Sequence, residues 1–273
     1  MSRRIADYHV HTRFSCDSDA TMEAICRAAL AQGMREIAIT DHADFEPLDP
    51  CHGYFQPELY WEAVGRCRAT FEGQLMIRAG VECGESHVYR REVAALLSAH
   101  DYDFVLGSLH WVDSRPAFDE TFFDGLELGE GLALYFDELA RLADQGEYDV
   151  LAHPDIIRRA VYRRFGLTEL DLSPHETQVR RMLRIVAERG KGLEVNTAYL
   201  RKGMGEPGPS VQVLRWFREE GGQVVTLGSD GHRPEHVGAG FDRSLAMVRE
   251  AGLGGLTVFH RRTPTRVLLA GGG

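Results

Sequence analysis

Seven short apolar segments alternate with longer segments of helical periodicity, and this alternation limits the available folds more than any other feature of the chain. The strand-like segments lie at 5–11, 36–41, 76–82, 103–109, 149–153, 192–197 and 223–229. Strands that are separated by helices pair in parallel, because each connection returns the chain to the same end of the sheet. The pattern therefore predicts an α/β fold, either a barrel or an open sheet.

Helix signals fill the spaces between these segments. Pro57 is placed like the first-turn proline of a helix. Residues 173–176 read as a capping box with proline at the first helical position, and this helix is expected to end near Gly190. Asp242 is expected to cap another helix, which ends at Gly252.

The composition is that of ordinary globular protein. The 273 residues show no break in composition and no repeat, so we expect a single domain over 1–273. The segment 201–210 reads as a loop, and Gly271 to Gly273 as a frayed end. The net charge of −10 argues against a protein that holds long nucleic acid by neutralising phosphates.

The chain has no signal-like apolar core near its start and no apolar run of about 18 residues, the length of a membrane span. We therefore expect a soluble, cytoplasmic protein without a membrane partner. The five cysteines never form a Cys-x-x-Cys pair, which supports neither a disulfide framework nor a zinc ribbon. They are expected to be reduced and mostly in the core.

Metal-capable side chains stand at the carboxyl ends of the predicted strands, in every strand except the sixth. They are His9 and His11, then His42, Glu82, His110 and His153, and finally Asp230 and His232. The carboxyl ends of parallel strands meet at one rim, where sites are built. Each pair or motif is weak alone, but their joint placement predicts a metal site at that rim.

The residue types narrow the choice of metal. Imidazole with carboxylate suits zinc, iron and manganese, and no candidate thiolate accompanies them. Six histidines with at least two carboxylates exceed the ligands of one four-coordinate ion. A multinuclear site is the consequence.

Seven separated motifs, in order, carry a resemblance that runs along the whole chain. They are HVHTRFSCDSD, ITDHADF, AGVECG, GSLHWV, AHPD, NTAYLRK and SDGHRPEHVGAGFD. Together they resemble the PHP superfamily, in its monofunctional histidinol-phosphate phosphatase branch. The resemblance implies a distorted TIM-like (β/α)7 barrel of parallel strands, with a trinuclear metal centre at the C-terminal rim.

The resemblance also implies a set of ligands for each metal. One ion would be held by His9, His11, Glu82 and Asp230; Glu82 would bridge to a second, held by His110 and His153; Asp17, His42 and His232 would hold the third. Strand-end logic does not find Asp17, which lies in the loop after the first strand. Asp17 could instead cap the helix that starts near Ala20.

A site of this kind balances the charge of a phosphate monoester. Three divalent ions against three carboxylates leave an excess of about three positive charges, which a phosphate dianion and one bridging hydroxide neutralise. The expected mechanism is direct attack on phosphorus by the metal-bridging hydroxide. A metal-bound water, Asp17 or His232 would protonate the leaving oxygen.

Arginine is the expected phosphate-binding side chain beside the metals, because its planar guanidinium donates two hydrogen bonds to phosphate. The chain also has 29 arginines and only two lysines. Arg201 and Arg158 lie in loops on the predicted rim and resemble arginines of the phosphatase branch, while Arg159 competes with Arg158. Asp41 and Asp7 could orient imidazoles or simply make hydrogen bonds at strand ends.

Two further features concern the substrate. Asn196 could touch it or cap a turn, and the loop 43–56 is a candidate wall for its organic part. An acidic group in that loop could meet a cationic amine.

The first reading is a phosphoric monoester hydrolase that converts L-histidinol phosphate to L-histidinol and phosphate in histidine biosynthesis. A PHP phosphoesterase acting on nucleotides or oligonucleotides is the enzymatic alternative, and a non-catalytic metal-binding accessory PHP domain is the other. An amidohydrolase barrel often uses a carboxylated lysine at a strand end, and neither Lys191 nor Lys202 ends a predicted strand. The sequence leaves metal identity and oligomeric state open.

Overall fold

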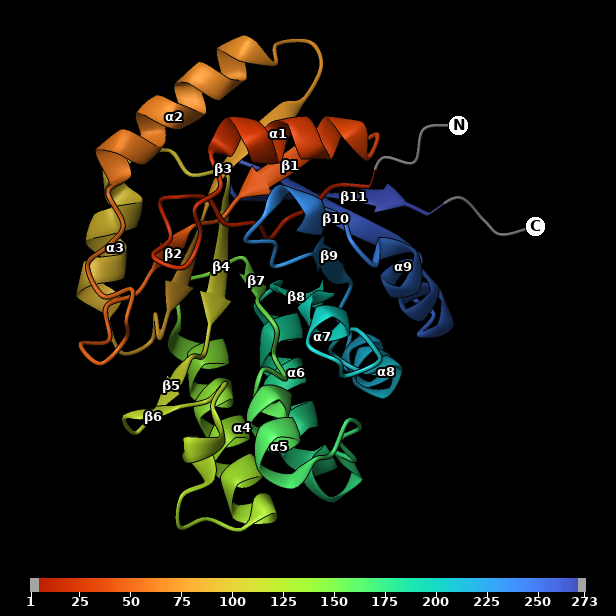
Figure 1. Ribbon diagram of the computed structural model, residues 1–273. Helices are drawn as coiled ribbons and strands as arrows, with labels where there is room; N and C mark the ends of the chain where they lie inside the picture. Colours follow the sequence, from red (N-terminus) through yellow and green to blue (C-terminus); the bar gives the residue numbers. More distant parts are fainter. Residues whose placement is uncertain (1–4, 270–273) are drawn as a thin grey trace.

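A curled sheet of parallel strands forms the centre of the protein in a computed structural model that describes residues 5–269 (Figure 1). Six strands follow one another across it in the order β1, β3, β4, β7, β8 and β9. Their bounds are Glu36–Ile39, Met76–Gly84, Phe104–Ser108, Val150–Leu151, Gly192–Asn196 and Val224–Gly228. A short strand β2, His42–Ala43, pairs in parallel with the end of β3. The expected parallel α/β architecture is confirmed.

The prediction of a continuous strand at 5–11 is wrong, although the segment does lie in the barrel wall, between β1 and β9. Only single bridges remain, from Asp7 to Ile37 of β1 and from Val10 to Gly231 after β9. The reason is that side chains bind its backbone: Val10 N donates to Thr40 Oγ1 at 3.1 Å, and His9 N donates to the Asp7 carboxylate at 3.2 Å.

This segment nevertheless closes the curled sheet, because its backbone bonds to both edges. Ala38 N of β1 donates to Asp7 O at 2.9 Å, and Tyr8 N donates to Leu227 O of β9, also at 2.9 Å. The result is the distorted TIM-like barrel that was expected.

Helices surround the sheet (Figure 1). They are α1 Met22–Ala31, α2 Pro57–Thr70, α3 Arg90–Ala99, α4 Leu128–Gln145, α5 Ile157–Phe165, α6 Glu176–Glu188, α7 Ala198–Arg201, α8 Val211–Glu219 and α9 Phe241–Glu250. Single 3₁₀ turns lie at Glu120–Phe123, Ser173–His175 and Pro234–His236. Within residues 5–269, no helix has the length and apolar character that crossing a membrane requires.

Two helix starts differ from the predictions. Ser173 does not cap α6, because Asp171 Oδ1 accepts a hydrogen bond from Ser173 N and the chain makes a 3₁₀ turn before Glu176. Asp242 lies inside the first turn of α9, whose N-cap is Gly240 in a left-handed conformation. Pro57 begins α2 as expected. The predicted frayed end at Gly271 to Gly273 lies outside the described residues.

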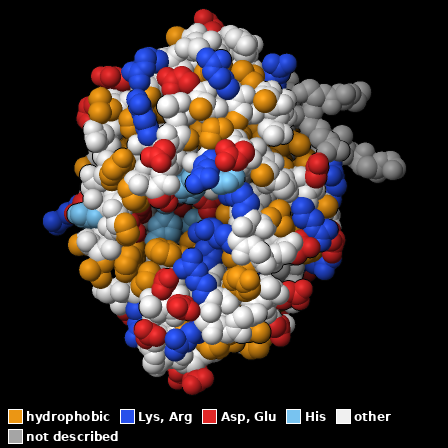
Figure 2. Space-filling view, viewed as in Figure 1, with side chains coloured by type: hydrophobic (Ala, Val, Ile, Leu, Met, Phe, Trp, Pro, Cys, Tyr) orange, Lys and Arg blue, Asp and Glu red, His pale blue; other side chains and the backbone are white. Residues whose placement is uncertain are grey.

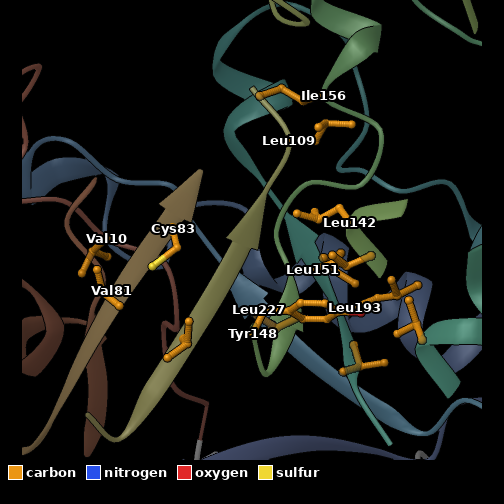
Figure 3. Close-up of a cluster of buried hydrophobic side chains, with 14 of the residues drawn as sticks. Val10, Val81, Cys83, Leu109, Leu142, Tyr148, Leu151, Ile156, Leu193 and Leu227 are labelled. Carbon is orange, nitrogen blue, oxygen red and sulfur yellow. The ribbon is translucent and has the colours of Figure 1, made fainter. Parts of the chain in front are cut away.

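The core has two parts. The first includes Val10, Val81 and Cys83 together with Leu151 and Leu193, and Figure 3 shows all five of these side chains. The second part lies inside the barrel and includes Tyr8, Phe104 and Phe259.

Phe259 comes from an antiparallel hairpin of β10, Gly255–His260, with β11, Thr263–Leu268. Its backbone nitrogen donates to Tyr8 Oη at 2.7 Å. The barrel interior is therefore packed with side chains, so it holds no channel, and a site is expected at the rim of C-terminal strand ends.

A second small hairpin extends from that rim. Strands β5, Trp111–Val112, and β6, Arg115–Pro116, pair antiparallel directly after His110. The hairpin brings Phe118 to the rim, where its ring centroid lies 6.2 Å from that of His110.

The expectation that the cysteines are all reduced is wrong. Cys16 and Cys51 form a disulfide with a Cα–Cα distance of 5.3 Å. Their 35-residue separation gives no sequence signal; the two loops meet only because both follow strands that end at the same rim. Cys26, Cys67 and Cys83 are free and buried, as expected.

The Cys16–Cys51 disulfide should change the number of cysteines that react with a thiol reagent. In denaturant without reductant, three cysteines should react with an alkylating agent, and five after reduction, as mass spectrometry would show. Because the cross-link restricts the unfolded chain, the Cys16→Ala/Cys51→Ala variant should lose about 2–4 kcal/mol of unfolding free energy in urea titrations. Reductant should leave the stability of that variant unchanged. Five reactive thiols before reduction would contradict the disulfide.

Candidate metal centre

Eight of the nine predicted ligands gather at the barrel rim from strand ends and the short segments after them. His9 and His11 come from the N-terminal segment, His42 from β2, Glu82 from β3, and His110, His153, Asp230 and His232 from the ends of β4, β7 and β9. Many of them line a cavity of about 580 Å³. Figure 2 looks into this hollow, where histidine and acidic side chains meet on the floor.

Glu82 is the centre of the cluster and has no solvent exposure. Its Oε2 atom lies 3.2 Å from His9 Nε2, 3.5 Å from His11 Nε2 and 3.2 Å from His42 Nδ1. Its Oε1 atom lies 2.9 Å from His153 Nε2 and 3.5 Å from His110 Nε2. The two oxygens thus face different sets of imidazoles, as a carboxylate that bridges two cations would.

The donor atoms fit divalent metal ions. His9 Nε2 and His11 Nε2 face each other at 3.0 Å, and Asp230 Oδ1 lies 3.5 Å from His11 Nε2. Several sets of three ligand atoms lie within 4.8 Å of one another, among them His11 with His42 and His232. Imidazole nitrogens and carboxylate oxygens at this spacing suit zinc, iron or manganese.

Asp17 joins the cluster from the loop after the N-terminal segment. Its Oδ2 atom lies 2.9 Å from His232 Nε2 and 3.8 Å from His42 Nε2. The alternative role, capping of the first helix, belongs to Thr21, whose hydroxyl accepts a hydrogen bond from Ala24 N. The structure therefore brings all nine predicted ligands together.

Charge neutralisation accounts for the pKa values in the cluster. Burial raises the pKa of Glu82, but the charges of His9 and His42 and hydrogen bonds from His110 and His153 outweigh it and hold the pKa well below its usual range. Burial lowers the pKa of His42, but Glu82 and Asp44 outweigh it and raise the pKa to about 10. Burial dominates at His11, whose pKa falls to about 3. Protons and metal cations therefore compete for the same atoms.

Glu194 is a supporting residue that sequence reasoning missed, since the sixth predicted strand carried no predicted metal ligand. It lies in β8, where Oε1 contacts His9 Nδ1 at 2.6 Å and Oε2 accepts a hydrogen bond from His153 N at 2.7 Å. A Cβ atom on Gly228 would lie 1.8 Å from Glu194 Oε1, so only glycine leaves room for this carboxylate. A lone acidic residue in an apolar strand was the available signal.

Asp44 belongs to the loop 43–56, which was expected to form a wall of the substrate site, but its contact with the metal cluster was not predicted. Its Oδ2 atom lies 3.2 Å from His42 Nδ1, and its Oδ1 atom lies 3.4 Å from His110 Nδ1. It is 3% exposed and lines the cavity. Its position two residues after His42, in the ITDHADF motif, was the available signal.

Asp41 and Asp7 act on the cluster indirectly. Asp41 accepts hydrogen bonds from Thr12 N and Ser15 Oγ, and Ser15 Oγ lies 3.0 Å from His11 Nδ1. Asp7 accepts from the backbone nitrogens of His9, Ser229 and Gly238, and so joins the first segment to the last loops of the barrel.

Asn196 supports both the turn after β8 and Glu194. Its Oδ1 atom accepts a hydrogen bond from Ala198 N at 2.9 Å, and its Nδ2 atom donates to Glu194 Oε2 at 3.1 Å.

Three cationic side chains line the same cavity: Arg159, Arg201 and Lys202. Arg159 donates to Asp230 Oδ2 at 2.8 Å, while its buried Nε has no hydrogen-bond partner. Arg201 donates to Ser229 O and Asp230 O, which ties α7 to the end of β9.

Arg158 points elsewhere. It donates to Asp155 Oδ2 at 3.1 Å, its guanidinium lies 4.7 Å from the centre of the Tyr199 ring, and it is absent from the cavity lining. Of the two neighbouring arginines, the structure brings Arg159 to the metal cluster and Arg158 to the packing behind it.

Curated proteins of similar sequence cover almost the whole chain. The histidinol-phosphatase of Lactococcus lactis subsp. lactis strain IL1403 is 26% identical over 258 residues, which cover 93% of each chain. A probable histidinol-phosphatase of Deinococcus radiodurans is 28% identical over 265 residues, 94% of this chain and 98% of that protein.

Solved structures show the same fold. A crystal structure of histidinol phosphate phosphatase from Lactococcus lactis, in complex with zinc, L-histidinol and phosphate, matches with a TM-score of 0.87 at 23% identity, over 96% of this chain and 99% of that chain. A putative histidinol phosphatase from Listeria monocytogenes matches with a TM-score of 0.74 at 19% identity, over 87% of this chain and 98% of that chain.

The family assignment rests on a match to a family model. The model of the PHP domain matches residues 7–198, which is more than half of the chain and includes seven of the nine predicted ligands. The chain therefore belongs to the PHP domain family.

Proposed function

We propose that this protein is a metal-dependent phosphatase that hydrolyses L-histidinol phosphate to L-histidinol and phosphate. The observation that carries the proposal is one cavity that joins a nine-residue cluster of metal-binding atoms to three cationic side chains. The names of the relatives support the choice of substrate, since histidinol-phosphatases match over most of both chains.

The cluster would hold three divalent ions. His9, His11, Glu82 and Asp230 would bind one, with Glu82 shared by a second on His110 and His153, and Asp17, His42 and His232 would bind the third. Zinc is present in the Lactococcus lactis structure, and iron and manganese take the same ligands. When bound, the ions would supply water that is acidified enough to attack phosphorus, and would neutralise the phosphoryl oxygens.

Arg159 and Arg201 would bind the phosphate oxygens. Arg159 lines the cavity beside Asp230 and its Nε–H has no acceptor among the described residues, so its guanidinium would donate to a phosphate oxygen there. Lys202 lies beside them: the charge of Arg159 and burial lower its pKa to about 8, which indicates that cations crowd this wall. An anionic substrate relieves that repulsion.

The leaving alcohol needs a proton, and the Asp17–His232 pair would position its source. The two side chains lie 2.9 Å apart at the partly exposed edge of the cluster, with His232 25% exposed. As ligands of the third ion they would hold a water at that edge, and this water would give its proton to the leaving oxygen.

Phosphate release tests the function directly. Protein stripped of metal and refilled with zinc, iron or manganese should bind close to three ions per chain and release phosphate from L-histidinol phosphate at least tenfold faster than from a nucleotide panel, by kcat/KM. Asp17→Ala should bind about one ion fewer by elemental analysis. Equal rates on mononucleotides would favour a nucleotide phosphoesterase, and metal binding without turnover would favour an accessory domain.

Substitution of Arg159 or Arg201 should weaken catalysis, whereas substitution of Arg158 should not. Arg201→Ala and Arg159→Ala should raise KM and lower kcat/KM by about 10- to 100-fold without loss of metal, because each removes a charged hydrogen-bond donor to phosphate. Arg158→Ala is the matched control: it should lower the melting temperature and leave KM close to the wild-type value. Similar KM values for Arg159→Ala and the wild type would contradict the proposed contact.

Metal affinity should fall with pH. The pKa of His42 is raised to about 10 in the metal-free protein, so His42 is protonated at neutral pH and metal binding must release that proton. Calorimetric titration of the metal-free protein with Zn²⁺ in buffers of different ionisation enthalpy should show proton release, with affinity falling from about pH 8 to pH 6. A heat of binding that is independent of buffer would contradict this competition.

A further inference from the structure

The cavity has a second wall that is not part of the metal cluster or of the cationic group. Asp49, Pro50 and Cys51, from the loop after β2, line it together with Phe118 from the segment after β6. The cationic side chains Arg159 and Arg201 follow β7 and β8, which are farther along the barrel. In Figure 2, Lys and Arg gather on one side of the hollow and hydrophobic side chains on another.

Asp49 gives this second wall a negative charge. Its Oδ2 atom accepts a hydrogen bond from Trp111 Nε1 at 2.7 Å, and its Oδ1 atom accepts one from Cys51 N at 2.7 Å. A carboxylate accepts about four hydrogen bonds, so Asp49, which lines the cavity, can accept about two more. None of the ion pairs described within residues 5–269 involves Asp49, which leaves its charge available to a ligand.

The surroundings hold Asp49 in position. The Cys16–Cys51 disulfide ties its loop to the loop that carries Asp17, and Glu46 Oε2 of the same loop accepts a hydrogen bond from Tyr89 Oη at 2.6 Å. Trp111 packs edge-on against Phe118, with ring centroids 6.4 Å apart. A carboxylate that is already in place pays little ordering entropy when a ligand binds.

The two walls together favour one kind of substrate. It would place its phosphate against the cationic side chains and the metal cluster, its carbon skeleton against Pro50 and Phe118, and a cationic substituent at Asp49. We propose that Asp49 determines specificity by receiving the ammonium group of an aminated phosphate monoester. This inference rests on the proposed phosphatase function and deepens it, because it names the group that separates L-histidinol phosphate from phosphate esters without an amine.

The test compares two substrates that differ only in the amine, together with a third, generic phosphate ester. L-Histidinol phosphate carries the ammonium group, 3-(imidazol-4-yl)propyl phosphate lacks it, and p-nitrophenyl phosphate lacks both amine and imidazole. In Asp49→Asn, kcat/KM for L-histidinol phosphate should fall about 10- to 100-fold, mainly through KM, because a charged hydrogen bond is lost. For the two other substrates, kcat/KM should change less than about twofold, and metal content should not change.

Two variants serve as controls. Asp49→Glu keeps the negative charge and should retain most of the preference for the aminated substrate. Asp101→Asn removes one carboxylate charge at an exposed position outside the cavity lining, and should leave all three substrates unaffected.

The outcomes separate this inference from the proposed function. Equal losses on all three substrates in Asp49→Asn would make Asp49 a structural residue and overturn the inference. A wild-type protein that hydrolyses the desamino ester as well as L-histidinol phosphate would also overturn it, while leaving the phosphatase function intact. If the wild type releases phosphate from none of the three, the proposed function fails, and the inference fails with it.

Discussion

A completely buried carboxylate, Glu82, stands among five imidazoles, and the rest of the site depends on this arrangement. A charge in the barrel interior is costly unless groups of opposite charge surround it. The imidazoles meet that requirement either by holding protons or by binding metal cations in place of those protons. Both place positive charge next to the same two oxygens. A cluster of this kind is stable only with cations in it, which is why its geometry indicates metal binding more strongly than any single motif does.

The barrel supplies the precision that the cluster needs. Parallel strands deliver their last residues to one rim, and the N-terminal segment places His9 and His11 there by bonding to both edges of the sheet. Glu194, in β8, then fixes His9 through its ring and His153 through its backbone. The carboxylate has this position only because Gly228 of the neighbouring strand has no side chain. The residues that form the barrel wall therefore also position the ligands of the site.

Around the metal cluster, the cavity walls differ in charge. Helices α5 and α7, which follow β7 and β8, contribute cations, whereas the loop after β2 contributes the Asp49 carboxylate and is tied across the rim by a disulfide. The net charge of −10 belongs to the protein as a whole and hides this local separation. A phosphate ester with a cationic group at its other end matches both walls at once.

The sequence by itself determined the alternation of strands and helices and the side chains at the strand ends, because both follow from local periodicity and from the chemistry of residue types. All nine predicted ligands come together in the structure. The tertiary structure alone decided the Cys16–Cys51 disulfide and the support from Glu194, since both depend on distances between segments far apart in the chain. It also decided between Arg158 and Arg159: neighbours on a helix point about 100° apart, and only packing sets which of them faces the cavity.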